Sequence, residues 1–237
     1  MNERHPGSST RESSADASAA EVLAEAMPTA AESRAATYRF LSALLLNEVT
    51  SDFLKAAATQ PPVTDGTLGA YFASLSTANI EQARIDAAAE FAALLLNMSP
   101  NPVAVYESVY TSPEHLMMQE ARDGVLAAYR AEGFAVGKSQ NLPEDHISFE
   151  LEFMALLCER EEACMSTLDA AGAGHSRAVQ KAFLTDHLLR WAPILAADLA
   201  SKARSNLYRG LAETLSQFLE FEREEFGLPP ASQHAAC

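Results

Sequence analysis

The sequence predicts an all-α fold, and three observations lead to that prediction. The chain of 237 residues is rich in Ala, Leu and Glu, which favour helices, and 48% of its residues are hydrophobic, enough to form a core. It contains only 10 Gly and few β-branched residues. No stretch alternates apolar and polar residues with the period of two that a half-buried strand requires. We therefore expect one domain of about ten helices, arranged in two lobes.

Apolar residues at helical spacing predict the individual helices, and Pro and Gly separate them. Pro100 and Pro102 indicate an extended loop over residues 98–105. Pro193 is expected to break the helix that precedes it. The predicted helices cover about residues 30–47, 51–60, 64–76, 79–97, 111–132, 143–168, 176–189, 194–202 and 206–226.

Two of these predicted helices depend on local start and stop signals. Thr111 and Glu114 have the spacing of a capping box, so a helix is expected to start at Thr111. Gly172 and Gly174 are expected to end the region that begins at Pro143, because glycine commonly follows the last turn of a helix.

Composition also predicts how the chain is divided. Serines and glycine near the N-terminus favour a disordered tail over residues 1–28. A polar connector at residues 137–141 is the best boundary between two lobes. The predicted divisions are a tail at 1–28, an N-terminal lobe at 29–137, a C-terminal lobe at 138–226 and a tail at 227–237.

The charge and the cysteines restrict the class of protein. Lys and Arg number 17 and Asp and Glu 32, which gives a net charge of −15 and argues against binding to nucleic acid. Such a charge suits a cationic partner, and it equally suits an acidic cytosolic protein without one. The three cysteines form no C-x-x-C pair. Without an export signal, an Arg-Arg pair or a long apolar run, the chain is expected to be cytoplasmic and to have no membrane span.

A cluster of ionisable residues follows Pro143, namely Glu144, Asp145 and His146. Acids in the first turn of a helix gain from the helix dipole, so an ordinary capped helix start explains two of the three. A protonated histidine is unfavourable there, which hints at a second role. Exposed carboxylates beside aromatic rings would suit the guanidinium groups of a basic peptide. The aromatic residues considered for this role are Tyr106, Tyr110 and Trp191.

Catalytic and metal-binding patterns are absent from the sequence. His146 and Glu150 are four residues apart on one helical face, but no H-E-x-x-H motif and no pair of Glu-x-x-His motifs accompanies them. The chain has no G-x-S-x-G, P-loop or G-x-G-x-x-G sequence. We expect neither an enzyme nor a metal or cofactor site. A metal-dependent enzyme and a generic acidic scaffold, each built on a helical bundle, are kept as alternatives.

Four segments together resemble the TorD/DmsD/NarJ family of redox enzyme maturation chaperones. Pro143-Glu144-Asp145-His146, with Glu150-Leu151-Glu152-Phe153-Met154 after it, is similar to the family's signature. The segments Tyr38-Arg39-Phe40-Leu41 and Pro102 to Tyr110, which ends in Y-E-S-V-Y, resemble two others. Phe183 to Pro193 resembles the family's F-L-x-x-H-L-x-x-W-x-P segment. The resemblance spans about residues 34–200.

The resemblance implies a cytoplasmic, non-catalytic chaperone for an exported molybdoenzyme of the dimethyl sulfoxide or trimethylamine N-oxide reductase type. Such chaperones bind the twin-arginine signal peptide and the apo form of the catalytic subunit until the cofactor is inserted. Whether this chain is a monomer or a dimer is left open.

We expect the peptide to dock between the two lobes, with the acids contacting its arginines. His146 and His187 can instead be structural, and Trp191 can be part of the core. The expected peptide-binding residues are Glu144, Asp145, His146, Glu150, Tyr106, Tyr110, His187 and Trp191.

Overall fold

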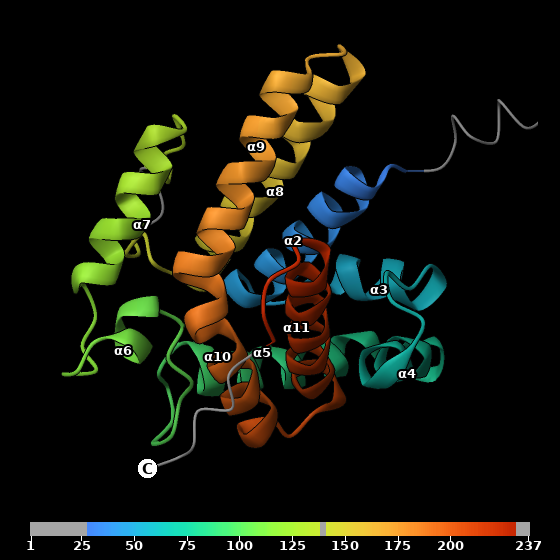
Figure 1. The fold of residues 1–237 in the computed structure, drawn as a ribbon. Helices are drawn as coiled ribbons and strands as arrows, with labels where there is room; N and C mark the ends of the chain where they lie inside the picture. The colour runs from blue at the N-terminus through green and yellow to red at the C-terminus, as the bar shows by residue number, and fades with distance from the viewer. Residues whose placement is uncertain (1–27, 138–140, 231–237) are drawn as a thin grey trace, which may run out of the picture.

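The structure is a computed structural model that describes residues 28–137 and 141–230. It confirms the all-α class, because the regular elements in these residues are helices and the only β pairing among them is one isolated bridge (Figure 1). The predicted tail at 1–28 lies almost wholly outside the described residues, as do 138–140 of the predicted connector and 231–237 of the C-terminal tail. The division into two lobes stays a prediction.

The first helices start at local capping signals. α2 (Ala30–Leu46) opens with a capping box in which Thr29 and Glu32 satisfy each other's backbone N–H groups. α3 (Ser51–Thr59) follows, and then α4 (Gly66–Ser74) runs into a 3₁₀ turn (Leu75–Thr77). The Asn79 side chain accepts hydrogen bonds from the first turn of α5 (Ile80–Leu95), as its sequence position predicts.

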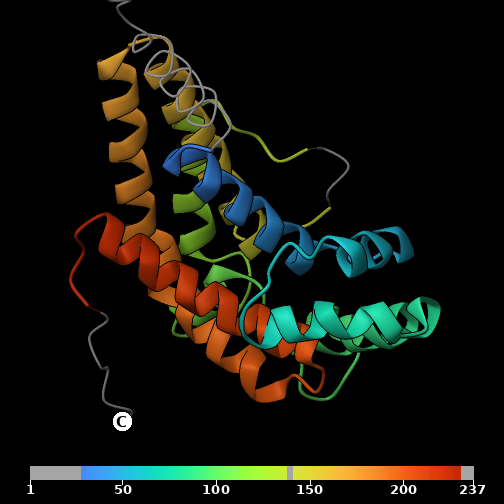
Figure 2. The same cartoon turned by 90° about the vertical axis from the view of Figure 1, so that its right-hand side faces the viewer.

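The second half of the chain forms the long helices. α8 (Ile147–Ser166) and α9 (Ala170–Phe183) lie side by side and antiparallel (Figure 1). α9 continues through a π-helical turn (Leu184–Leu188) into α10 (Leu189–Lys202), and α11 (Asn206–Glu225) packs along α10. α2 lies on α8 and α4 lies on α11, so early and late parts of the chain share one hydrophobic core (Figure 2).

The helix predicted from Thr111 to Glu132 is wrong in its first part. α6 is a short helix that ends at Thr111 (Glu107–Thr111), and α7 begins only at Glu120 (Glu120–Ala131). The Thr111 hydroxyl donates back to the carbonyl of Glu107, so it closes one helix instead of capping the next. Residues 112–119 form an irregular loop in which His115 and Met118 have positive φ angles.

The predicted stops in the second half are also wrong. Gly172 and Gly174 lie inside α9, because Asp169 caps that helix by accepting a hydrogen bond from the Gly172 N–H. Pro193 lies inside α10 and does not end it. Proline removes only the one hydrogen bond that its N–H would donate to the Leu189 carbonyl, and α10 packs along α11, so the helix continues past this residue.

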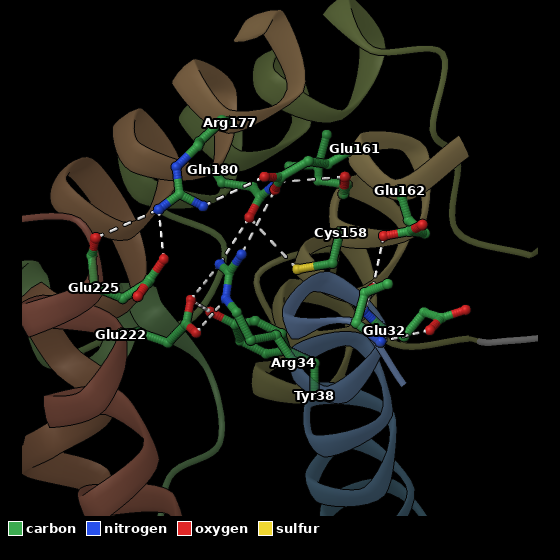
Figure 3. A network of polar contacts seen from close by, with 12 residues as sticks. Glu32, Arg34, Tyr38, Cys158, Glu161, Glu162, Arg177, Gln180, Glu222 and Glu225 are labelled. Carbon is green, nitrogen blue, oxygen red and sulfur yellow. Dashed lines mark hydrogen bonds and ion pairs between the residues drawn. The ribbon is translucent and has the colours of Figure 1, made fainter. Parts of the chain in front are cut away.

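A buried polar network joins α2, α8, α9 and α11 (Figure 3). Arg34 of α2 donates to both carboxylate oxygens of Glu222 on α11, each at 2.6 Å, and to Gln180 of α9 at 2.7 Å. The Tyr38 hydroxyl donates to Glu222, and the Gln180 amide donates to Glu161 of α8. Both ends of the Arg34–Glu222 pair are almost fully buried, with 4% and 0% of the side chains exposed. The network therefore fixes how the four helices meet at this point.

Candidate functional site

The Pro143–His146 segment forms a turn before α8. The His146 N–H donates to the Pro143 carbonyl, and α8 begins at Ile147. The prediction that Glu144 and Asp145 belong to the first turn of this helix is therefore wrong. An isolated antiparallel bridge pairs Tyr106 with His146 through two backbone hydrogen bonds, from Glu107 to Asp145 and from Ile147 to Val105. This bridge holds two sequence motifs side by side.

Asp145 caps a helix that is distant in sequence. Its Oδ2 atom accepts hydrogen bonds from the backbone N–H and the hydroxyl of Ser108, which lies in the first turn of α6. The carboxylate is thus stabilised by the N–H groups at the start of α6, which have no partner within that helix, and by the dipole of α6. It is not stabilised by the dipole of α8. Asp145 is fully buried. The expectation that its carboxylate is exposed is therefore wrong.

Glu144 lies at the edge of the same turn. Its carboxylate accepts a hydrogen bond of 2.6 Å from Arg122 of α7, and about a quarter of each of the two side chains is exposed. The Tyr129 hydroxyl donates to the Glu144 carbonyl. This ion pair ties the turn to α7 and leaves the Glu144 carboxylate within reach of solvent.

His146 is the N-cap residue of α8. Its Nδ1 atom accepts a hydrogen bond of 3.1 Å from the Ser148 N–H, a role that requires Nδ1 to be unprotonated. Burial lowers the pKa of His146 to about 4. The ring of Tyr106 meets the imidazole edge to face at 5.2 Å. The imidazole is therefore neutral, so the unfavourable interaction expected between a protonated histidine and the N-terminus of the helix does not arise.

A second group of ionisable side chains is buried behind this turn. The His187 Nδ1 atom lies 2.8 Å from a carboxylate oxygen of Glu107, and the Trp191 indole N–H donates to Glu150 at 3.2 Å. Glu107, Glu150 and Trp191 are fully buried. Burial first, and then the charge of Glu107, raise the pKa of Glu150 well above its usual range, which favours its protonated form.

The structure brings most of the predicted site residues together and buries many of them. Tyr106 contacts His146, while Tyr110 packs at 5.6 Å against Trp191, which lies in the core. These contacts agree with the alternative in which His146 and His187 have structural roles and Trp191 is part of the core. Among the eight predicted residues, those with partly exposed side chains are Glu144, Tyr106, Tyr110 and His187.

An apolar groove of about 450 Å³ lies beside the turn. It lies between the end of α5, the Pro102–Tyr106 strand-like segment and the loop after α6. Leu96, Met117 and Leu142 contribute apolar side chains that are 50%, 48% and 36% exposed. Tyr106 forms part of the groove and is half-buried. Exposed apolar side chains gathered in a hollow are typical of surfaces that bind a peptide or protein partner.

Sequence reasoning missed the residues that complete this site. Glu107 and Ser108 stand out in the sequence only as part of the Y-E-S-V-Y motif, and nothing local distinguishes Arg122. Leu96 and Met117 fall within predicted helices, whereas the structure places both outside its helices. The Y-E-S-V-Y motif is the one sequence signal that could have pointed to Glu107 and Ser108. If its Glu and Ser are buried, they need polar partners elsewhere in the chain.

Metal-binding and membrane-spanning features are both missing from the described residues. Residues 28–137 and 141–230 contain no group of three or more His, Cys, Asp or Glu side chains placed to hold a metal ion. Within the same ranges, no helix combines the length and the apolarity that crossing a bilayer requires.

Comparisons with known proteins point to one family. Residues 62–197, more than half of the chain, match the family model described as nitrate reductase delta subunit. The chain is 26% identical over 204 residues to the chaperone protein TorD of Photobacterium profundum, covering 81% of this chain and 93% of that protein.

Two further similarities were found. The chain is 26% identical over 145 residues to the perchlorate reductase assembly chaperone protein of Dechloromonas aromatica, covering 57% of this chain and 61% of that protein. The crystal structure of a redox enzyme maturation protein from Archaeoglobus fulgidus superposes with a TM-score of 0.47 at 20% identity, over 79% of this chain and 93% of that one.

Proposed function

Because the chain belongs to the nitrate reductase delta subunit family, which includes the TorD-like redox enzyme maturation chaperones, we propose that it is a chaperone for an exported molybdoenzyme. In this proposal it acts in the cytoplasm and is not an enzyme. It binds the twin-arginine signal peptide and the apo form of the catalytic subunit until the cofactor is inserted. One relative named as a chaperone and another named for the assembly of perchlorate reductase support this assignment.

The apolar groove beside Pro143–His146 is the observation that favours peptide binding most. A signal peptide carries an apolar segment, and Leu96, Met117 and Leu142 offer it exposed apolar surface. Methionine is flexible and polarisable, so it suits a groove that accepts different apolar sequences. In our proposal, the apolar part of the peptide lies in this groove, and Tyr106 lies at the edge of the groove.

The predicted peptide-binding residues then divide into two roles. Tyr106 and Glu144 touch the peptide, because their side chains are partly exposed and border the groove or the turn. Asp145 and His146 act from behind, since they hold α6 and the start of α8 in place. The remaining predicted residues support the same surface from below or beside it, namely Glu150, Tyr110, His187 and Trp191.

Substitution of two groove residues tests this proposal. In Met117→Glu/Leu142→Glu, carboxylates replace apolar contacts that are each worth about 1.5 kcal/mol or more when buried. We expect affinity for a synthetic peptide with an Arg-Arg pair and a following apolar segment to fall at least about tenfold. Isothermal titration calorimetry measures the affinity, and circular dichroism checks that the helices persist.

Leu168→Glu is the matched control, because Leu168 is 91% exposed and lies in the turn between α8 and α9. This variant should bind the peptide like the wild type. A wild-type protein that fails to bind the peptide, and that captures no molybdoenzyme subunit from its native lysate, would rule out the proposed function.

A further inference from the structure

Exposed methionines gather at the apolar groove. Met117 lines the groove and is 48% exposed. Met98 and Met118 each directly follow a lining residue in the chain, and they are 74% and 59% exposed. Met154 is fully buried in α8, whereas Met165, in the last turn of α8, is exposed. In the part of the chain that the structure describes, three of the four exposed methionines therefore lie at or beside this one hollow.

The loop after α6, which carries two of these methionines, is held in place by polar contacts. The Nδ1 atom of His115 lies 2.9 Å from the carbonyl oxygen of Val109, and the Gln119 N–H donates to the Ser108 hydroxyl at 3.2 Å. Met118 has a φ of 61°, a left-handed conformation that is unfavourable for a residue other than glycine. The loop is therefore anchored in a strained conformation that keeps two methionine side chains at the surface.

The methionine thioether is the readily oxidised group at this groove. Within the described residues, no cysteine lines it. Cys158 is fully buried, and Cys164 lies in the last turn of α8. An oxidant that reaches the groove therefore meets the sulfur of methionine, which it converts to the sulfoxide.

Oxidation changes the surface that the groove presents to an apolar segment. A thioether is apolar, flexible and polarisable, whereas a sulfoxide is polar and its oxygen accepts hydrogen bonds. An apolar ligand that covers this oxygen removes it from water without supplying a donor. Because burial of an unsatisfied polar group is unfavourable, the oxidised groove binds an apolar segment more weakly than the reduced one.

We propose that Met117, together with Met98 and Met118, forms an oxidation site that switches off peptide binding in the groove, an inference that rests on the proposed function. The oxidant is a hydroperoxide such as hydrogen peroxide. The sulfur lone pair attacks one peroxide oxygen, so that an S–O bond forms and the O–O bond breaks. The other oxygen takes the proton of the transferred oxygen and leaves as water. Sulfur is oxidised by two electrons and the peroxide is reduced by two, and methionine sulfoxide reductases reverse the change.

Isothermal titration calorimetry on the full chain, before and after treatment with hydrogen peroxide, tests this inference. The ligand is a synthetic peptide with an Arg-Arg pair and a following apolar segment that lacks Met, Cys and Trp, and the peroxide is removed before titration. We expect the affinity of the wild type to fall on the order of tenfold. Methionine sulfoxide reductases with a thiol reductant should restore it. The reductant alone, which reverses disulfides and leaves sulfoxides, should not.

Two variants separate the methionines at the groove from the rest of the chain. Met98→Leu/Met117→Leu/Met118→Leu keeps apolar side chains of similar volume that lack the oxidisable sulfur. Met165→Leu is the matched control, because it removes the exposed methionine that lies away from the groove, on α8. Each protein is compared with itself before and after treatment, so a difference in starting affinity does not affect the result. We expect peroxide to change the affinity of the triple variant little and to weaken Met165→Leu as much as the wild type.

Peptide mapping by mass spectrometry shows which methionines carry the added oxygen. An unchanged affinity of the wild type once Met98, Met117 and Met118 are sulfoxides would overturn the inference, and so would an equal loss in the triple variant. Methionines at the groove that stay reduced while Met165 is oxidised would overturn it as well. In all three cases the untreated wild type still binds the peptide, so the proposed function stands. An untreated wild type that does not bind the peptide overturns both.

Discussion

At the scale of single residues, His146 shows how one side chain can fix a helix start without carrying charge. Its imidazole accepts the Ser148 N–H, and burial keeps it neutral by lowering its pKa to about 4. In the unfolded chain the same residue has an ordinary pKa near 6.5. Between these two values the unfolded state binds one more proton than the folded state, so folding loses stability as the pH falls from about 6.5 to about 4.

The substitution His146→Asn tests this linkage. Asparagine can accept the same N–H as an N-cap residue and does not titrate. We expect the wild type to lose about 2 kcal/mol more stability than the variant between about pH 7 and pH 5. Urea denaturation at the two pH values measures the difference. Parallel pH profiles for the two proteins would show that His146 is not the group responsible.

At the scale of elements, the packing of α11 on α4 depends on a glycine. A Cβ atom at Gly210 of α11 would lie 2.4 Å from the backbone nitrogen of Leu68 in α4. Backbone atoms cannot rotate away as a side chain can, so the two helices would have to separate. This contact joins the N-terminal helices to the last helix of the chain.

Two glycine substitutions separate this packing effect from helix propensity. Gly210→Ala should destabilise the protein by about 1–3 kcal/mol, because the helices are forced apart. Gly174→Ala lies in the exposed interior of α9, where an added Cβ would meet no other part of the protein within 4 Å, so it should stabilise the protein by roughly 0.5–1 kcal/mol. Thermal or urea unfolding measures both. The packing argument fails if Gly210→Ala is as stable as the wild type.

At the scale of the whole molecule, the Arg34 network holds four helices in one arrangement. Arg34 lies at its centre, between Glu222 of α11 and Gln180 of α9, and contacts Glu161 of α8 at 3.6 Å (Figure 3). Removing the guanidinium leaves the Glu222 carboxylate buried, and within residues 28–137 and 141–230 the Tyr38 hydroxyl is then its only remaining donor. A buried charge without its partner is strongly destabilising.

Two substitutions on the same helix measure the value of this network. Arg34→Met should cost about 3–5 kcal/mol. Arg39→Met removes an arginine whose side chain is 42% exposed and pairs with Glu152 and Glu159, and it should cost no more than about 1 kcal/mol. Chemical denaturation of the three proteins gives both values. Similar losses of stability in the two variants would show that burial does not make the ion pair of Arg34 more important for stability than the exposed pairs of Arg39.

The sequence by itself determined the fold class, most helix boundaries and the family resemblance. Thr29, Asn79 and the paired prolines at 61 and 62 act through hydrogen bonds or backbone limits within a few residues, so their effects can be read locally. The resemblance of the Pro143–His146 segment likewise depends only on residue order. The site residues drawn from it lie close together in the structure, at or behind the bridge between Tyr106 and His146.

Only the tertiary structure decided which partner each polar residue takes. Asp145 caps α6 instead of its own helix, and Trp191 faces the core. In each case, partners or packing that local sequence patterns do not reveal decide the outcome. A carboxylate or hydroxyl binds the nearest unsatisfied donor or acceptor in space, and packing alone sets which groups are near.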